Sequence, residues 1–252
     1  MLLSFDAGAR AITQPLRPLK SLKPLRPVGQ VRRMRAAETA RDPTAATPRT
    51  DESLRLAALE LFVERGFHGT SMREIALRAG TSVSHLYYYH PSKDDLLEAM
   101  MVGIVDDLLG LLGEALAAAG DDPGDRLRAV VEAQVRFHCE RRAEAFVGRS
   151  ELRSLDAEKR SHVVARYDRV TALFRGVIDD GVRQGRFDCA DRKEATSAVL
   201  SMCNGVSTWY SRSGRLTPTT IAERYAALVL RMVGERGLRV RSSTPRHAST
   251  PT

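Results

Sequence analysis

Residues 71–96 read SMREIALRAGTSVSHLYYYHPSKDDL. Ser71 and Glu74 have the spacing of a capping box, in which each side chain accepts a hydrogen bond from the other residue's backbone N–H, so a helix begins here. Gly80 suits the left-handed conformation that ends a helix, and Ser82 suits the cap of the next one. The stretch therefore predicts two short helices joined by a tight turn, the form of a helix-turn-helix module.

The segments on either side carry the same helical signal. Apolar residues recur at three- and four-residue steps from Thr50 to a stop at Gly66, which predicts a supporting helix before the pair. Ser92 and Asp95 repeat the capping-box spacing and open a helix after it. No segment alternates in the manner of a strand, so we expect an all-α chain. Further helical periods cover about 125–141, 157–184, 192–211 and 217–233.

The positive charge of the chain lies in its two ends. The sequence has 39 Lys and Arg against 31 Asp and Glu, a net charge of +8. Residues 1–50 hold ten basic and three acidic residues, and residues 236–252 hold four arginines and no acid, which leaves 25 basic and 28 acidic residues in the middle. The overall basicity therefore says little about the domain that would read a DNA sequence.

The two ends also differ from the middle in composition. Residues 1–49 are rich in proline, which blocks both helix and central strand, and residues 236–252 are rich in Ser, Thr and Pro. We expect both segments to be disordered tails. Two alternatives stay open for the first one: an organelle transit sequence, or translation that begins at Met34.

The remaining composition favours a soluble, globular, cytoplasmic protein. Hydrophobic residues make up 43% of the chain, and charged residues interrupt every apolar run before it could span a membrane. Cys139, Cys189 and Cys203 are far apart, which predicts neither a disulfide framework nor a metal site and suits a reducing compartment. We expect no cofactor.

At the helix-turn-helix residues the chain resembles the TetR/AcrR family of transcription regulators. The chain departs from the family at His90, where Phe is usual, and at Ser84 and His85, where Gly or Thr is commoner. These positions lie on or beside the reading helix, so they bear on the operator sequence. The strings that carry the resemblance are AALELF at 57–62, GFHGTSMREIA at 66–76, AGTS at 79–82 and LYYYHPSKDDL at 86–96.

The resemblance implies a DNA-binding role for nine residues. Residues 83–85 would face bases, Leu86 would anchor the helix, and the hydroxyl and cationic groups would contact phosphates. Packing is the alternative for the tyrosines at 87–89, of which we expect at least one to be half-buried, and His90 is expected to pack or cap. The nine residues are Ser71, Arg73, Ser82, Val83, Ser84, His85, Tyr87, Tyr88 and Lys93.

The second half resembles the lipid-metabolism branch of the family, over NGVSTWYSR at 204–212, LTP at 216–218 and IAERY at 221–225. Members of that branch often respond to acyl-CoA thioesters, so the resemblance implies a small-molecule effector with acyl-CoA as a candidate. Wide apolar stripes on the last two helices predict a four-helix interface between two copies. The stripes comprise Ala195, Ala198, Val199, Met202, Val206 and Trp209, then Ile221, Tyr225, Leu228, Val229 and Met232.

Eight residues are candidates for the effector pocket, because they mix apolar and polar groups on helices expected to face a cavity. Core packing is the competing interpretation for each: Phe137, His138, Phe146, Arg149, Tyr167, Phe174, Met202 and Trp209. A phosphate-bearing ligand would need cations near the pocket mouth, although a solvated charged face explains the same residues. The candidates are Arg141, Arg142, Arg149 and Arg153.

The sequence therefore predicts an all-α protein with a three-helix DNA-binding domain at 50–97 and a helical effector-binding and dimerisation domain at 98–235. We expect a sequence-specific homodimeric repressor that leaves a palindromic operator when its effector binds. An enzyme is one alternative, but adjacent pairs such as Asp106 and Asp107 diverge on a helix, and no hydrolase, zinc-protease or phosphate-loop motif is present. A DNA-binding or scaffold protein without an effector is the other, which a fully packed second half would favour.

Overall fold

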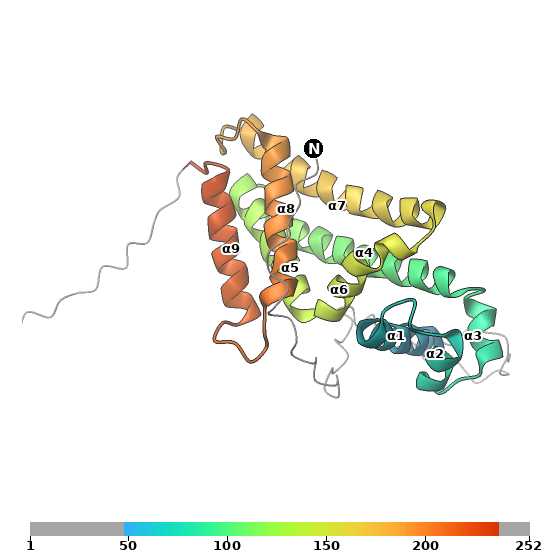
Figure 1. The fold of residues 1–252 in the computed structure, drawn as a ribbon. Helices are drawn as coiled ribbons and strands as arrows, with labels where there is room; N and C mark the ends of the chain where they lie inside the picture. Colours follow the sequence, from blue (N-terminus) through green and yellow to red (C-terminus); the bar gives the residue numbers. More distant parts are fainter. Residues whose placement is uncertain (1–47, 237–252) are drawn as a thin grey trace, which may run out of the picture. The chain divides into compact units, whose positions relative to one another are not determined.

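The computed structural model describes residues 48–236, and among these residues every regular element is a helix. The all-α prediction is therefore confirmed, and Figure 1 shows the arrangement. The predicted tails lie outside the described residues except at their inner ends, since the first helix already begins at Pro48. In chain order the elements are α1 (Pro48–Arg65), α2 (Met72–Arg78), α3 (Val83–Tyr89), α4 (Lys93–Ala118), α5 (Pro123–Glu140), α6 (Arg142–Ser150), the 3₁₀ helix η1 (Leu152–Ser154), α7 (Ala157–Arg183), α8 (Arg192–Trp209) and α9 (Pro218–Met232).

Helix α1 forms because its apolar residues share one face. Leu54, Ala58 and Phe62 are four residues apart and fully buried, so the helix packs along a single stripe. The helix ends at Gly66, whose φ of 73° lies in the left-handed region, and the Gly66 N–H donates to the Phe62 carbonyl at 2.9 Å. The stop predicted at Gly66 is confirmed.

Helix α4 joins the two halves of the chain. Its 26 residues run without interruption across the boundary predicted between residues 97 and 98. Buried side chains occur along its length, including Leu96, Met101 and Leu112, and the helix packs against α5 and α7. All described residues belong to one compact unit, so the helix-turn-helix module and the second half share this helix as a common element.

Helix α5 is the centre of the second half. It begins at an Asp122 cap with Pro123 in the first helical position, where a missing N–H costs nothing. Leu127, Val131 and Val135 are fully buried, and the helix packs against every helix from α4 to α9. Figure 1 shows α8 and α9 packed against it near the end of the chain.

Helix α6 was not expected from the sequence. The chain leaves α5 at Arg141, whose φ of −106° and ψ of 45° break the helix although neither Gly nor Pro is present. The new direction is fixed by packing, because Val147 and Gly148 of α6 are buried. A side chain at Gly148 would place its Cβ 2.9 Å from the Tyr167 hydroxyl of α7, so the absence of a side chain allows the two helices to approach closely.

Candidate functional site

The turn between α2 and α3 has the geometry that the sequence predicted. Ser71 Oγ accepts a hydrogen bond from the Glu74 backbone N–H at 3.3 Å, and the Ser71 N–H donates to Glu74 Oε2 at 2.9 Å, which completes the capping box. Gly80 has a φ of 70°, and Ser82 caps α3 by accepting from the His85 N–H at 3.1 Å. The pair of helices is therefore held at a fixed angle by local contacts.

The reading helix α3 is anchored on one side and open on the other. Leu86 is fully buried, and Val83 and Tyr89 are partly buried against the core. Ser84 and the tyrosines at 87 and 88 are exposed, with Tyr88 69% accessible. The expectation that one tyrosine of the run is half-buried is confirmed at Tyr89.

His85 lies at the edge of this open side. It is half-buried, and its ring meets the Tyr89 ring edge-on with the centroids 5.0 Å apart. Tyr89 in turn meets the Tyr88 ring edge-on at 5.3 Å. The contact with Tyr89 restricts the histidine ring to a defined position.

Most cations of the module are already paired within it. Between residues 51 and 93 there are five basic side chains, and Arg73 is the one for which the described residues provide neither an ion pair nor a hydrogen bond. The others are engaged as follows: Arg55 with Asp51, Arg65 with Glu74, Arg78 with Glu60 and Glu64, and Lys93 with backbone carbonyls.

Lys93 is held inside the module. Its ammonium donates to the carbonyls of Phe67 and Thr70, both at 2.7 Å, and lies 4.3 Å from the centre of the Phe67 ring. Two of its three N–H donors are thereby used to fix the loop between α1 and α2 to the start of α4. Its predicted phosphate contact would have to rely on the third donor.

Ser71 is also committed internally. Its hydroxyl donates to Glu74 Oε2 at 2.8 Å, in addition to the capping-box bonds. These hydrogen bonds from the Ser71 side chain and backbone, followed by the charge of Arg65, lower the pKa of Glu74, so the carboxylate stays charged and keeps the cap closed. To contact DNA as predicted, the Ser71 hydroxyl would have to release the Glu74 carboxylate and donate its hydrogen bond to a phosphate instead.

His90 packs and caps, as expected. His90 is 7% accessible. Its backbone N–H donates to the Leu86 carbonyl at 2.9 Å, and its ring Nε2 lies 3.1 Å from Asp51 Oδ1. A phenylalanine at this position could not make the contact with Asp51. The departure from the family residue therefore ties the end of the reading helix to the first turns of α1.

The predicted pocket residues do not share one environment. Phe137, His138 and Phe174 are buried, Tyr167 and Met202 are partly buried, and Phe146, Arg149 and Trp209 are exposed. His138 of α5 and Arg149 of α6 are close enough to interact electrostatically, and Tyr167 of α7 lies beside Gly148, the residue before Arg149. His138 Nδ1 donates to the Gln134 carbonyl at 2.9 Å, and burial lowers the pKa of His138, with the charge of Arg149 lowering it further. Tyr167 adds its hydroxyl beside Gly148.

The arginines proposed for a phosphate separate into two groups. Arg141 pairs with Asp107 at 2.9 Å and with Glu144, and lies 4.9 Å from the Phe137 ring centre. Arg142 donates from Nε to the Ser207 carbonyl at 3.1 Å, so these two act within the fold. Arg149 and Arg153 instead line an open cleft.

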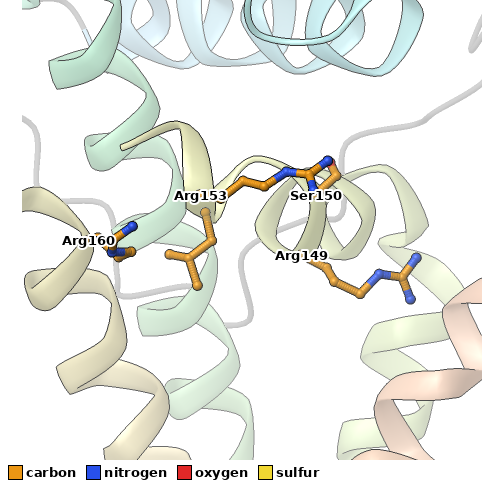
Figure 2. Close-up of a pocket in the computed structure, with 5 residues that line it drawn as sticks. Arg149, Ser150, Arg153 and Arg160 are labelled. Carbon is orange, nitrogen blue, oxygen red and sulfur yellow. The ribbon is translucent and has the colours of Figure 1, made fainter. Parts of the chain in front are cut away.

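That cleft, which we call the arginine cleft, has a volume of about 380 Å³ and lies between α6, η1 and α7. Figure 2 shows Arg153 beside Ser150 on the α6–η1 side, Arg160 across from them on α7, and Arg149 extending away at the far end. Sequence reasoning missed Arg160, because it enters the cleft from another helix and no local pattern connects it with the others. The lining residues are Arg149, Ser150, Leu152, Arg153 and Arg160.

The last two helices keep an apolar surface that the other residues of the described range, 48–236, leave exposed. Val199, Val206 and Val229 face the core and are fully buried. Trp209, Leu228 and Met232 are 52%, 45% and 44% accessible, and the Trp209 ring lies 6.3 Å from the Tyr225 ring between centroids. The predicted stripes are therefore split between the core and an outer face on α8 and α9.

None of the helices in residues 48–236 combines the length and apolar character needed to cross a membrane. Within the same residues no group of three or more His, Cys, Asp or Glu side chains could hold a metal ion.

Comparisons with known proteins match both halves of the chain. Residues 54–100 match the family described as bacterial regulatory proteins, tetR family, and residues 120–233 match the tetracyclin repressor-like, C-terminal domain. Over 193 residues the chain is 30% identical to the HTH-type transcriptional repressor KstR2 of Rhodococcus jostii strain RHA1, which covers 76% of this chain and 94% of that protein.

Solved structures show the same fold. A bacterial regulatory protein of the tetR family from Rhodococcus RHA1 is 33% identical with a TM-score of 0.70, over 75% of this chain and 99% of that one. AibR, solved in complex with isovaleryl coenzyme A and operator DNA, is 24% identical with a TM-score of 0.62, over 74% of this chain and 99% of that one. The chain belongs to the TetR family, and within that family it is a DNA-binding transcription regulator and not an enzyme.

Proposed function

We propose that the protein binds a palindromic operator as a homodimer and leaves it when a CoA thioester binds to the second half. The observation that carries the proposal is the uncommitted polar surface of α2 and α3. Four exposed side chains on it have no hydrogen bond or ion pair with any described residue: Arg73, Ser84, Tyr87 and Tyr88.

These side chains suit two kinds of contact. The major groove is wide enough to admit helix α3 with its N-terminal residues at base edges, where Val83, Ser84 and His85 would read sequence. Tyr87 and Tyr88 follow one turn later and would donate their hydroxyls to phosphates, and Arg73 would add charge from α2. Phosphate contacts position the module, while base contacts select the site.

Dimerisation follows from the size of this surface. One seven-residue helix covers too few base pairs to select a genomic site, so two copies are needed about one helical turn apart, on the order of 34 to 36 Å. The outer face of α8 and α9 is the part of the described chain that fits a two-fold interface, because Trp209, Leu228 and Met232 bring large apolar groups together on adjacent helices.

The relatives support a CoA thioester as the effector. AibR was solved with isovaleryl coenzyme A and operator DNA, and KstR2 is a repressor that matches this chain through both halves. In this chain the second half carries the arginine cleft, which can hold phosphates. A ligand that prefers one dimer geometry shifts the population toward it, and the reading helices then no longer match the groove spacing.

The experiment begins with selection of the operator from random duplex DNA by the purified full chain. The affinity of that operator is then measured with and without isovaleryl-CoA, longer acyl-CoAs and steroid-CoA thioesters. An effector should weaken operator binding by a factor of about 5 to 150, and operator DNA should weaken effector binding by the same factor, because the coupling is reciprocal. A protein that binds its operator equally in the presence of every thioester would favour the alternative without an effector.

Variants of the reading surface test the DNA-binding part separately. Tyr87→Phe and Arg73→Met should weaken binding to operator and random DNA alike, whereas His85→Ala should change base preference. Tyr89→Phe is a matched control, since Tyr89 is a partly buried neighbour in the same run. An equal loss of discrimination in all of these variants would contradict the assigned roles.

A further inference from the structure

The arginine cleft concentrates unpaired positive charge. The side chains of Arg149, Arg153 and Arg160 have neither an ion pair nor a hydrogen bond with any described residue, and no acidic side chain is among the lining residues. Elsewhere in the second half many arginines are neutralised locally, as Arg175 is by Asp179 at 3.0 Å. Arg153 and Arg160 carry like charges on opposite sides of this space, and Arg149 adds a third at the far end (Figure 2), so a bound anion would stabilise the arrangement.

Apolar groups lie next to these cations. Leu152 lines the cleft itself. Phe146 is 42% accessible and precedes Arg149 by three residues on α6, while Val164 is 38% accessible and follows Arg160 by four residues on α7. Residues three or four apart on a helix are neighbours on its surface. The two helices that form the cleft, α6 and α7, therefore each carry an exposed apolar side chain one turn from a lining arginine.

We propose that the arginine cleft binds the phosphate groups of an amphiphilic ligand whose apolar part lies over Phe146, Leu152 and Val164. The proposal rests on the proposed function, because it places part of the effector at this cleft. Guanidinium groups recognise phosphate through pairs of parallel N–H donors, and Arg153 and Arg160 together can neutralise the two charges of a pyrophosphate diester. The volume of about 380 Å³ falls within the usual range of small-molecule sites.

The same segment touches the DNA-reading module. Helix α6 packs against α1, and the Glu151 carboxylate lies 3.9 Å from the position that a Cβ on Gly66 would take. Ser154 holds that carboxylate by donating to Glu151 Oε2 at 3.0 Å. A ligand that draws Arg153 toward its phosphates therefore acts on a segment in direct contact with the end of α1.

The test measures ligand binding to the full chain by titration calorimetry with three probes: octanoyl-CoA, coenzyme A and inorganic pyrophosphate. The double variant Arg153→Ala/Arg160→Ala should bind both CoA probes at least about tenfold more weakly, since the loss of a single charge-assisted contact already corresponds to about that factor. Phe146→Ala should weaken octanoyl-CoA more than coenzyme A. Arg136→Ala, on the exposed side of α5, is the control and should bind as the wild type does.

The outcomes separate this proposal from the proposed function. Unchanged binding of octanoyl-CoA by the double variant overturns the cleft assignment, even if the thioester still releases the operator. Pyrophosphate that binds as tightly as octanoyl-CoA overturns the amphiphilic part, because the apolar walls then contribute nothing. Loss of CoA binding in the double variant supports the assignment of the phosphate site to the arginine cleft. If no thioester releases the wild-type protein from its operator, the proposed function is wrong, whatever the cleft binds. Operator affinity of the double variant serves as the folding control.

Discussion

At the scale of single residues, Lys93 is a cation whose hydrogen bonds stabilise the fold, although the sequence predicts a contact with DNA phosphate. Its ammonium supports the Phe67 and Thr70 carbonyls in a partly buried position. Lys93→Met keeps the apolar stem and removes both bonds, so the free energy of unfolding in urea should fall by about 1–3 kcal/mol. Arg73→Met is the opposite case: stability should stay the same while operator affinity falls. An unchanged stability of Lys93→Met would show that the lysine acts mainly on phosphate.

His138 makes stability depend on pH. Burial, and to a smaller degree the charge of Arg149, lower its pKa from an ordinary value of 6.5, so the folded protein holds the neutral ring. The unfolded chain takes up a proton first as the pH falls, so stability is full above about 6.5 and declines below it, by at most about 1.4 kcal/mol per pH unit. Urea unfolding at several pH values should show a shallower decline in His138→Gln. Equal declines would assign the pH dependence to other groups.

At the scale of elements, α7 contains two glycines for which substitution by alanine should change stability in opposite directions. Gly181 is buried, and a Cβ there would collide with the Phe187 ring, which folds back over the end of the helix. Gly181→Ala should therefore lower the unfolding free energy by about 1–3 kcal/mol. Gly176 is exposed with open space around it, and Gly176→Ala should raise the unfolding free energy by up to about 1 kcal/mol, because alanine favours the helix. Thermal unfolding of both variants measures the contrast, which would be absent if the Phe187 loop moved aside.

At the scale of the whole molecule, the apolar face on α8 and α9 should determine the oligomeric state. Leu228→Glu places a charge at the centre of this face, so sedimentation should show a monomer and operator affinity should fall by about a hundredfold or more, as a two-site contact becomes a one-site contact. Leu111→Glu changes an equally exposed residue of α4 and should leave the dimer intact. A dimeric Leu228→Glu protein would place the interface elsewhere.

The distribution of charge over the chain leads to a second prediction at this scale. Residues 1–50 hold ten basic and three acidic residues, while Arg73 is the unpaired cation of the described module. Removal of residues 1–45 should flatten the salt dependence of operator binding, since each phosphate contact contributes roughly −0.9 to the slope of log affinity against log salt. The ratio of specific to random binding should stay nearly constant. An unchanged slope would exclude these residues from DNA binding.

Sequence reasoning succeeded wherever the decisive interaction is local. Gly66, Gly80 and the capping box of Ser71 were predicted and found, because caps and left-handed turns depend on residues within about four positions of each other. The same holds for the reading helix. The buried position of Leu86 and the exposed positions around it could be predicted because helical spacing alone determines which residues share a face.

The tertiary structure decided what depends on distant residues. The break at Arg141 has no Gly or Pro to announce it and arises because α6 packs through Val147 on the core. The sequence determined how many cations the chain has, but packing decided that Lys93 is engaged inside the module and that Arg160 of α7 faces Arg153 across a cleft. Charges are neutralised or left free by neighbours far away in the chain, and only the folded arrangement brings those neighbours together.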